Sequence, residues 1–170
     1  FDTLEAEPAE LVDMEPRNLP VVHLTAATLL RGLHSNRQLY ELMVDFWTNH
    51  FNIYIRKGPI RALQGKDDRE LIRPHAVGQF GDMLHASAKS PAMLFYLDNG
   101  SSTSDRPNEN YARELLELHT LGVDGGYTQF DVEEVARAFT GWTLSVGNRR
   151  APGTFGEFLF AERNHDEGEK

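Results

Sequence analysis

The longest regular pattern in the chain is Asn108-Glu109-Asn110-Tyr111-Ala112-Arg113-Glu114-Leu115-Leu116-Glu117-Leu118-His119-Thr120-Leu121-Gly122. One stripe of this pattern has the spacing that aligns side chains on a single helix face, namely Ala112, Leu115, Leu116 and His119. Asn108 can cap the N-terminus of such a helix, and Gly122 stands where a left-handed C-cap glycine belongs. The pattern therefore predicts an amphipathic helix over residues 108–121, with the imidazole of His119 pointing inward.

Helical patterns continue on both sides of this stretch. They cover residues 21–33, 35–54, 77–88, 92–97 and 128–139. After Trp142 the helical period is lost, and residues 143–146 and 155–160 predict two short strands that form a hairpin across the 147–153 loop. The fold class predicted is all-α: a multi-helix globular domain with a small irregular or β-containing C-terminal segment. We expect the helices over 35–54 and 108–121 to pack together, because they carry the longest apolar stripes.

The N-terminal 20 residues have a different character from the rest of the chain. They are acidic and contain Pro8, Pro16 and Pro20, which predicts an irregular N-terminal arm over residues 1–20. Residues 21–170 predict a single helical domain. The chain begins at Phe1 and closes on a polar segment, so we expect it to be a fragment of a longer chain.

The composition is that of a globular protein, with 40% hydrophobic and 25% charged residues. The net charge is -9, whereas a surface that binds nucleic acid is basic, so no nucleic-acid partner is expected. No apolar run approaches the roughly 20 residues that a membrane helix needs, which predicts a soluble chain without a transmembrane segment. The chain has no cysteine, which excludes disulfides, thiol nucleophiles and cysteine-based metal sites.

Two histidines fall on apolar helix faces, and acidic residues accompany one of them. His50 follows Phe46 and Trp47 at helical spacing, and His119 shares its helix with Glu114 and Glu117. Imidazole and carboxylate together suit zinc, iron or manganese, so a divalent metal is one cofactor to consider, with His50, Glu114 and His119 as its ligands. The alternative is a pair of core histidines bonded to buried partners, beside a solvated Arg–Glu face. Residues 117 and 119 lie about 200° apart on a helix, so a metal site would need a ligand from another element.

Two further residues complete the predicted ligand-binding set, which is His50, His75, Asn110, Glu114, Glu117 and His119. Pro74 is expected to kink or restart a helix, which would place His75 at a helix N-terminus and favour its neutral form. Asn110 follows a loop rich in small polar residues, beside a helix N-terminus that can hold an anion. The sequence contains no Gly-x-Ser-x-Gly elbow, P-loop or Gly-x-Gly-x-x-Gly motif, and the catalytic residues are therefore unknown.

Several segments together resemble a known family. They are Val44-Asp45-Phe46-Trp47-Thr48-Asn49-His50-Phe51, Ile72-Arg73-Pro74-His75-Ala76-Val77-Gly78, Ser90-Pro91-Ala92-Met93-Leu94 with Tyr96-Leu97-Asp98-Asn99, the 108–122 stretch, Asp131-Val132 with Ala136-Arg137-Ala138-Phe139-Thr140-Gly141-Trp142, and the final His165-Asp166-x-Gly-x-Lys. These look like the large bacterial family called domain of unknown function 1800 (DUF1800), over about residues 35–170. Members of that family are usually longer and many are thought to be exported, which implies missing flanks and a periplasmic or cell-envelope location. The family has no established activity, so the resemblance supplies no catalytic residues.

Two hypotheses of different classes follow. In the first, the chain is an envelope-associated helical domain, a ligand- or metal-binding enzyme fragment with a pocket near His50, Asn110, Glu114 and His119. In the second, it is a non-catalytic scaffold or partner-binding module in which the same polar residues form a buried structural network. A protein partner, or the missing flanks of the same chain, is expected in either case, and the small-molecule ligand is unknown.

Overall fold

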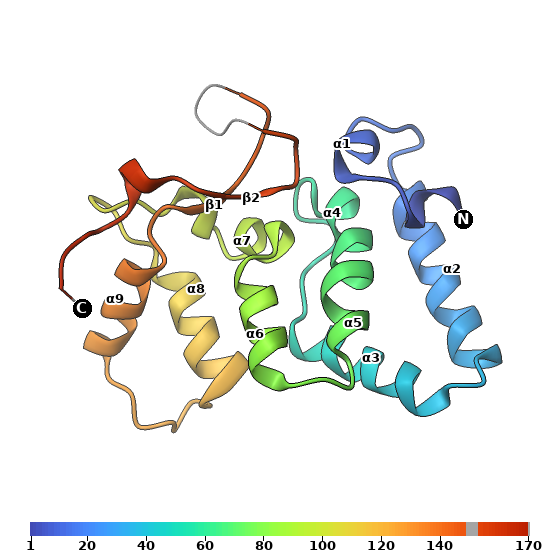
Figure 1. Ribbon diagram of the computed structural model, residues 1–170, viewed down its shortest axis with the longest axis horizontal. Coiled ribbons are helices and arrows are strands. Elements are labelled where there is room, and N and C mark those ends of the chain that lie inside the picture. Colours follow the sequence, from blue (N-terminus) through green and yellow to red (C-terminus); the bar gives the residue numbers. More distant parts are fainter. Residues whose placement is uncertain (149–152, 170) are drawn as a thin grey trace. The chain divides into compact units, whose positions relative to one another are not determined.

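The computed structural model describes residues 1–148 and 153–169 and is mostly helical, with one two-stranded sheet at its C-terminal side (Figure 1). Residues 149–152, in the predicted 147–153 loop, and Lys170, the last residue of the family motif, lie outside the described residues. Contacts divide the chain into two compact units, Phe1–Ala92 and Met93–Lys170, and each is described by itself. The predicted fold class is confirmed.

The first unit contains an N-terminal region with short helices, two longer helices and a segmented helical run. Its elements are η1 (Asp2–Leu4), α1 (Pro8–Leu11), α2 (Leu19–His34), α3 (Gln38–His50), α4 (Ile60–Lys66), η2 (Asp67–Ile72), α5 (Arg73–His75) and α6 (Phe80–Ala88). Helix α7 (Pro91–Tyr96) follows. The core of the unit is made of buried apolar side chains, among them Leu11, Val44, Phe51, Ile60, Leu63, Leu71 and Met83. α4 therefore supplies the buried centre, since it packs against both α1 and α2.

Ser35 and Gln38, in the connection between α2 and α3, have the spacing of a capping box but do not form one. Residue Arg37 is the N-cap of α3 and makes no side-chain cap bond. The Oγ of Ser35 instead accepts from the backbone N–H of Arg37, and the Gln38 amide donates to the carbonyls of Gly32 and Ser35. The same two residues thus close the turn between the helices. The Gln38 side chain satisfies carbonyl groups at the C-terminus of α2 that have no partner within the helix.

The residues from α4 to α5 form one continuous helical run, in which a new α-helical segment, α5, begins at Arg73 just before Pro74. The middle segment, η2, is π-helical, and the N–H of Arg73 bonds to the carbonyl of Asp68, five residues back. A widened turn of this kind reduces the clash of a proline ring with the preceding turn. His75 consequently lies at the C-terminal end of the run rather than at a helix N-terminus.

The second unit packs two helices beside a short hairpin. Its elements are η3 (Asn99–Ser101), α8 (Glu109–Glu114), the π-helical η4 (Leu115–Thr120), α9 (Gln129–Ala138), β1 (Trp142–Leu144), β2 (Phe158–Phe160) and η5 (Glu162–Asn164). α8 and α9 pack against each other (Figure 1), around fully buried Ala112, Val132 and Ala136. The predicted 108–121 helix is therefore correct in extent, but its second half is π-helical. The Thr120 hydroxyl follows this wider register, donating to the carbonyl of Leu115.

The predicted hairpin is confirmed by antiparallel pairing of β1 with β2, in a register that places Thr143 opposite Leu159. Gly141 precedes β1 with φ of 79°, a left-handed conformation that favours glycine. Its N–H donates to the carbonyl of Ser102, and its carbonyl accepts from the N–H of Ala161. This glycine therefore connects the hairpin to the loop before α8.

None of the helices in the described residues combines the length and apolar character needed to cross a membrane.

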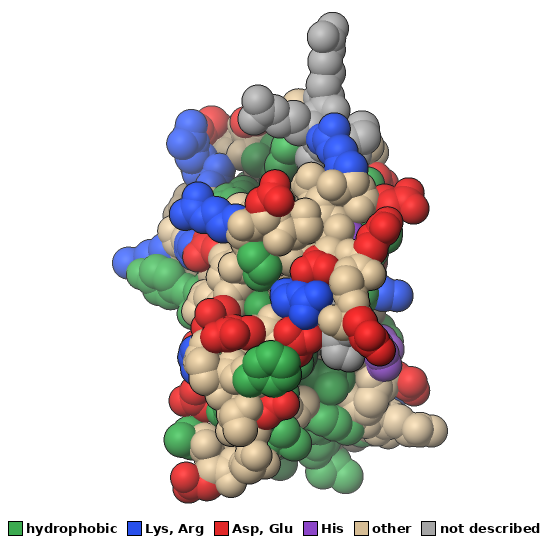
Figure 2. Space-filling model, turned by 90° about the vertical axis from the view of Figure 1, so that its left-hand side faces the viewer, with side chains coloured by type: hydrophobic (Ala, Val, Ile, Leu, Met, Phe, Trp, Pro, Cys, Tyr) green, Lys and Arg blue, Asp and Glu red, His purple; other side chains and the backbone are tan. Residues whose placement is uncertain are grey.

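Figure 2 shows acidic, basic and hydrophobic side chains interspersed over one face of the molecule. The charge of that face is mixed in sign, although acidic residues outnumber basic ones in the chain, 26 to 17.

Replacing Thr128 with Ala is expected to lower the free energy of unfolding by about 1 kcal/mol. Thr128 and Asp131 form a capping box at the start of α9, in which each side chain bonds the other residue's backbone N–H. Hydrogen bonds from the backbone N–H and the hydroxyl of Thr128 to the carboxylate lower the pKa of Asp131. Urea denaturation followed by circular dichroism measures the loss. Thr128→Ser keeps the hydroxyl and should retain most of the stability; an equal loss in both variants would show that the hydroxyl is not the stabilising group.

Candidate functional site

The first unit contains a cleft of about 590 Å³ between α2 and α3, closed by residues that follow α3 and by the helical run 60–75. This volume falls in the range of roughly 300–1,000 Å³ that is usual for small-molecule sites. Apolar side chains from both helices and the adjoining segments line it, including Leu24, Leu29, Leu33, Leu42, Phe51 and Ile53. Leu29, Leu33 and Leu42 are more than half exposed, so an occupant of the cleft would cover apolar surface that now faces water.

Asp67 lies in the wall of this cleft, at the start of the π-helical segment η2. The hydroxyl of Ser90, which is itself buried, donates to its Oδ1 at 2.5 Å. Burial raises the pKa of Asp67 to about 7, against the opposing effect of the Ser90 hydrogen bond, and the nearby charges of Asp68 and Glu70 raise it further. Near neutral pH this carboxyl can therefore hold or release a proton inside the cleft.

Asp68 extends the acidic wall and has two arginine neighbours. Burial raises its pKa, although the positive charges of Arg73 and Arg31 oppose that rise. Arg31 is 3.5 Å away, whereas Arg73 donates to both carboxylate oxygens of Glu41 at 2.8 Å. Arg73 is thus paired with Glu41 and Arg31 with Asp68, whereas the groups that act on Asp67 are Ser90, Asp68 and Glu70.

Gln64 adds a hydrogen-bond acceptor to the same wall. It lines the cleft one helical turn before Asp67 and Asp68, and its buried Oε1 accepts no hydrogen bond from the described residues. A buried acceptor without a donor costs on the order of 1–3 kcal/mol. A ligand that carries N–H or O–H groups would satisfy it.

Sequence reasoning missed this acidic pair as a site. The two aspartates look like N-cap residues in the sequence, because they precede the apolar pair Leu71-Ile72. One signal was available: Asp67 follows Ile60 by seven residues and Leu63 by four, on the helical stripe that those buried residues define. A carboxylate on a buried stripe is costly unless it is neutralised or paired, and such residues are candidates for function.

Two of the predicted site residues, His50 and His75, belong to the first unit. Both contact neighbouring residues of the fold. His50 lies among aromatic rings, with ring centroids 4.8 Å from Phe51 and 5.5 Å from Trp47. The Nδ1 of His75 is 2.7 Å from the carbonyl of Leu71. Neither histidine lines the cleft, so the structure does not join them to the acidic wall.

The other predicted site residues belong to the second unit. The inward orientation of His119 is confirmed, since it is only 5% exposed. Glu114 and Glu117 are half-buried, and the Nδ2 of Asn110 donates to the carbonyl of Leu97. Within residues 1–148 and 153–169, no three acidic or histidine side chains gather as a metal-binding group. The metal set of His50, Glu114 and His119, drawn from both units, stays a prediction.

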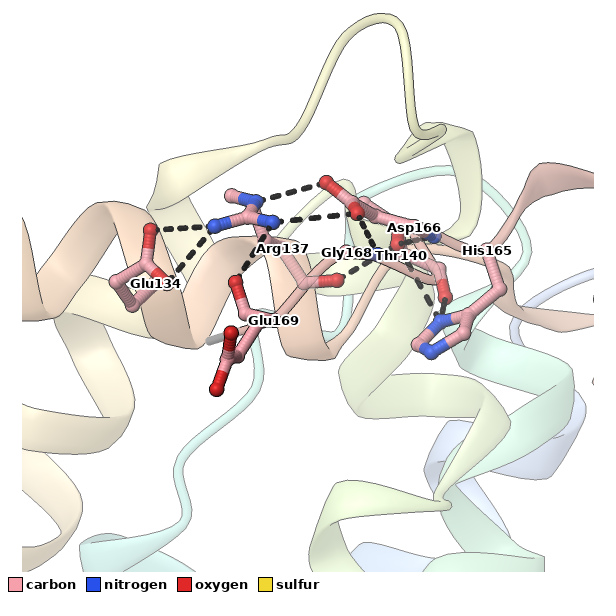
Figure 3. A network of polar contacts seen from close by, with 7 residues as sticks. All are labelled: Glu134, Arg137, Thr140, His165, Asp166, Gly168 and Glu169. Carbon is pink, nitrogen blue, oxygen red and sulfur yellow. Dashed lines mark hydrogen bonds and ion pairs between the residues drawn. The ribbon is translucent and has the colours of Figure 1, made fainter.

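A network around Arg137 joins two of the motifs that resemble the family (Figure 3). The guanidinium of Arg137, on α9, pairs with both Glu134 and Asp166 at 2.7 Å. The backbone N–H of Asp166 donates to the Thr140 hydroxyl, and the Nδ1 of His165 is 2.8 Å from the Thr140 carbonyl. The signature His165-Asp166 thus ties the C-terminal segment to the end of α9, which is a structural role.

Replacing Tyr111 with Phe is expected to raise the free energy of unfolding by about 1 kcal/mol. Tyr111 is fully buried in the signature stretch, and its hydroxyl finds no hydrogen-bond partner among the described residues. Burial raises the pKa of this phenol, and stranding a buried hydroxyl is unfavourable, so its removal should stabilise the protein. Urea denaturation provides the measurement, with the exposed Tyr54→Phe as control. A loss of stability in Tyr111→Phe would show that the hydroxyl has a stabilising partner in solution.

Comparison with known proteins gives one result that identifies the family. The family model described as "Protein of unknown function (DUF1800)" matches residues 4–170. No curated protein and no solved structure matches the chain. The family match covers both units, including the cleft of the first and the signature stretch of the second, and the chain therefore belongs to the DUF1800 family.

Proposed function

We propose that the first unit binds a small, largely apolar molecule in the cleft between α2 and α3, with a polar group of that molecule directed to Asp67. The observation that carries this proposal is a cleft of about 590 Å³ whose mostly apolar wall contains an acid with a pKa of about 7. Pockets that combine apolar lining with a few convergent polar groups and a perturbed pKa are typical of binding and active sites.

The π-helical segment supports the same location. π-turns are rare and occur frequently at functional sites, and η2 begins at Asp67 and contains Asp68. Both aspartates at the start of this wider turn line the cleft. An acid that can hold or release a proton near neutral pH also suits general acid–base chemistry on a bound molecule.

Filling the cleft tests the proposal. Gly32 lies on α2 in the cleft wall, and a Cβ built on it meets no atom within 4 Å. Gly32→Phe should therefore place a ring in the cleft, and binding of the neutral apolar dye N-phenyl-1-naphthylamine should weaken by about tenfold or more. Fluorescence titration gives the affinity.

The matched control is Gly81→Phe. Gly81 is also helical, on α6, its Cβ position is equally open, and it does not line the cleft. The control should bind the dye as the parent chain does. The proposal fails if the parent chain does not bind the dye, or if both substitutions change binding equally.

The alternative function, a scaffold whose polar residues form a structural network, is supported for the signature residues outside the cleft. The side chains of His75 and Asn110 are bonded to backbone carbonyls, and Asp166 is bonded to Arg137. Such bonds hold segments of the fold together. If Asn110 has this structural role, Asn110→Ala should lower the free energy of unfolding by about 1 kcal/mol and leave the affinity for the dye unchanged.

A periplasmic or cell-envelope location is also part of the proposal. Its support is the resemblance to a family with many exported members. Fractionation of cells that produce the protein from its native gene tests it, and recovery only in the cytoplasm would contradict it.

A further inference from the structure

We propose that the molecule bound in the cleft of the first unit is a cationic amphiphile, an apolar chain or ring system with an amine group that pairs with Asp67. This inference rests on the proposed binding function and adds the chemical class of the ligand. It commits to a small molecule, and a basic segment of a protein is treated as a competing outcome of the test.

The charge of the cleft wall is the first argument. Four carboxyl groups line it, those of Glu41, Asp45, Asp67 and Asp68, against the single guanidinium of Arg73. Arg73 is bound through 2.8 Å contacts to both oxygens of Glu41. Arg31 is likewise paired with Asp68 at 3.5 Å. Asp45 and Asp67, which line the cleft and form no ion pair within the described residues, make it attractive to a cation and repulsive to an anion.

The surroundings of Asp67 are the second argument. Asp67 accepts a hydrogen bond from the Ser90 hydroxyl, and two nearby acids, Asp68 and Glu70, carry charges that oppose its ionisation. No basic group of the described chain acts to lower its pKa. A carboxylate in this position would gain more from an incoming cation than one that already has an arginine, because removal from water makes an unpaired charge costly.

The apolar part of the cleft is the third argument. Helix α2 contributes lining residues from Leu24 to Leu33, which at a rise of 1.5 Å per residue is a length of roughly 13 Å. Along it Leu24, Leu29 and Leu33 offer apolar surface, and the buried Oε1 of Gln64 offers an acceptor for an N–H. One molecule that carries both an extended apolar body and an ammonium group matches all of these features.

Three probes with the same apolar chain and different head groups test the inference: decylamine, decanol and decanoate. Each is titrated, below the concentration at which it forms micelles and at about pH 8, against the complex of the 170-residue chain with N-phenyl-1-naphthylamine. The amine should displace the dye at a concentration about tenfold or more below that of the alcohol, which corresponds to about 1.4 kcal/mol. The carboxylate should be the weakest competitor.

Asp67→Asn should remove the preference for the amine while it leaves displacement by decanol unchanged. Asp82→Asn, an exposed position on α6 that does not line the cleft, is the matched control and should keep the preference. Circular dichroism melting confirms that each variant is folded.

The outcomes separate the two proposals. If the dye and all three probes fail to bind, the proposed binding function is wrong and the inference falls with it. If the probes bind with equal affinity, or decanoate binds best, the binding function stands and the inference is overturned. Persistence of the amine preference in Asp67→Asn also overturns it. Displacement by a lysine-rich amphipathic peptide, without displacement by decylamine, would identify a protein segment as the occupant instead.

Discussion

Replacing Asp67 with Asn is expected to raise the free energy of unfolding by up to roughly 4 kcal/mol at about pH 8, and to change it little at pH 4. The pKa of Asp67 is about 7 in the folded protein, against an ordinary value of 3.8. Between these values the unfolded chain loses a proton that the folded protein keeps, so folding becomes less favourable as pH rises from about 4 to 7. Asparagine cannot ionise, and its side-chain oxygen can still accept the hydrogen bond from Ser90.

Urea denaturation of the parent and the variant across this pH range measures the effect. The difference between their free energies of unfolding should grow from pH 4 to pH 7 and then level off. Asp68, whose pKa is also raised by burial, contributes a slope of the same sign to both proteins, and its charge is part of what raises the pKa of Asp67. The exposed Asp82→Asn should follow the parent at every pH. A constant difference between the parent and Asp67→Asn would mean that the Asp67 carboxyl ionises normally in the folded state.

Replacing Gly141 with Ala is expected to lower the free energy of unfolding by roughly 2–5 kcal/mol. Two costs combine at this position. A left-handed conformation costs a non-glycine residue about 1–2 kcal/mol, and φ of Gly141 is 79°. A Cβ there would also lie 2.8 Å from the carbonyl oxygen of Ala161 and 3.2 Å from the backbone nitrogen of His165. These are backbone atoms of the segment bound to Thr140, which cannot move without loss of that network.

Gly122→Ala is the matched control for this measurement. Gly122 has a similar φ of 85°, but no atom lies within 4 Å of its Cβ position. Its replacement should cost only the conformational part, about 1–2 kcal/mol. The difference between the two variants in urea denaturation therefore isolates the close packing of 161–165 against Gly141. Equal losses would show that this packing is absent in solution.

Local patterns were sufficient to predict most of the helices and the hairpin. The stripe of Ala112, Leu116 and His119 predicted the inward face of its helix, and His119 is buried there. The helical pattern predicted over 128–139 begins where α9 begins, at the capping pair Thr128 and Asp131. These predictions succeeded because helical period and capping are properties of neighbouring residues, which are present in the sequence whatever the rest of the chain does.

Predictions that depended on hydrogen-bond register were less accurate. The π-turns at Asp67–Ile72 and Leu115–Thr120 shift the register by one residue, and the helical run consequently continues through Pro74. Nothing in a pattern of apolar residues distinguishes a wider turn from a regular one over so few residues, because both present nearly the same side chains to the core.

The sequence by itself determined the helical fold class, the C-terminal hairpin, the burial of His119 and membership of the family, because each depends on residue order and short-range spacing. Only the tertiary structure decided which polar residues form a candidate site. Asp67 and Asp68 look like capping residues in the sequence, and they line a cleft because α2 and α3 stand beside the helical run that carries them. The raised pKa of Asp67 has the same origin, since burial is produced by segments distant in the sequence.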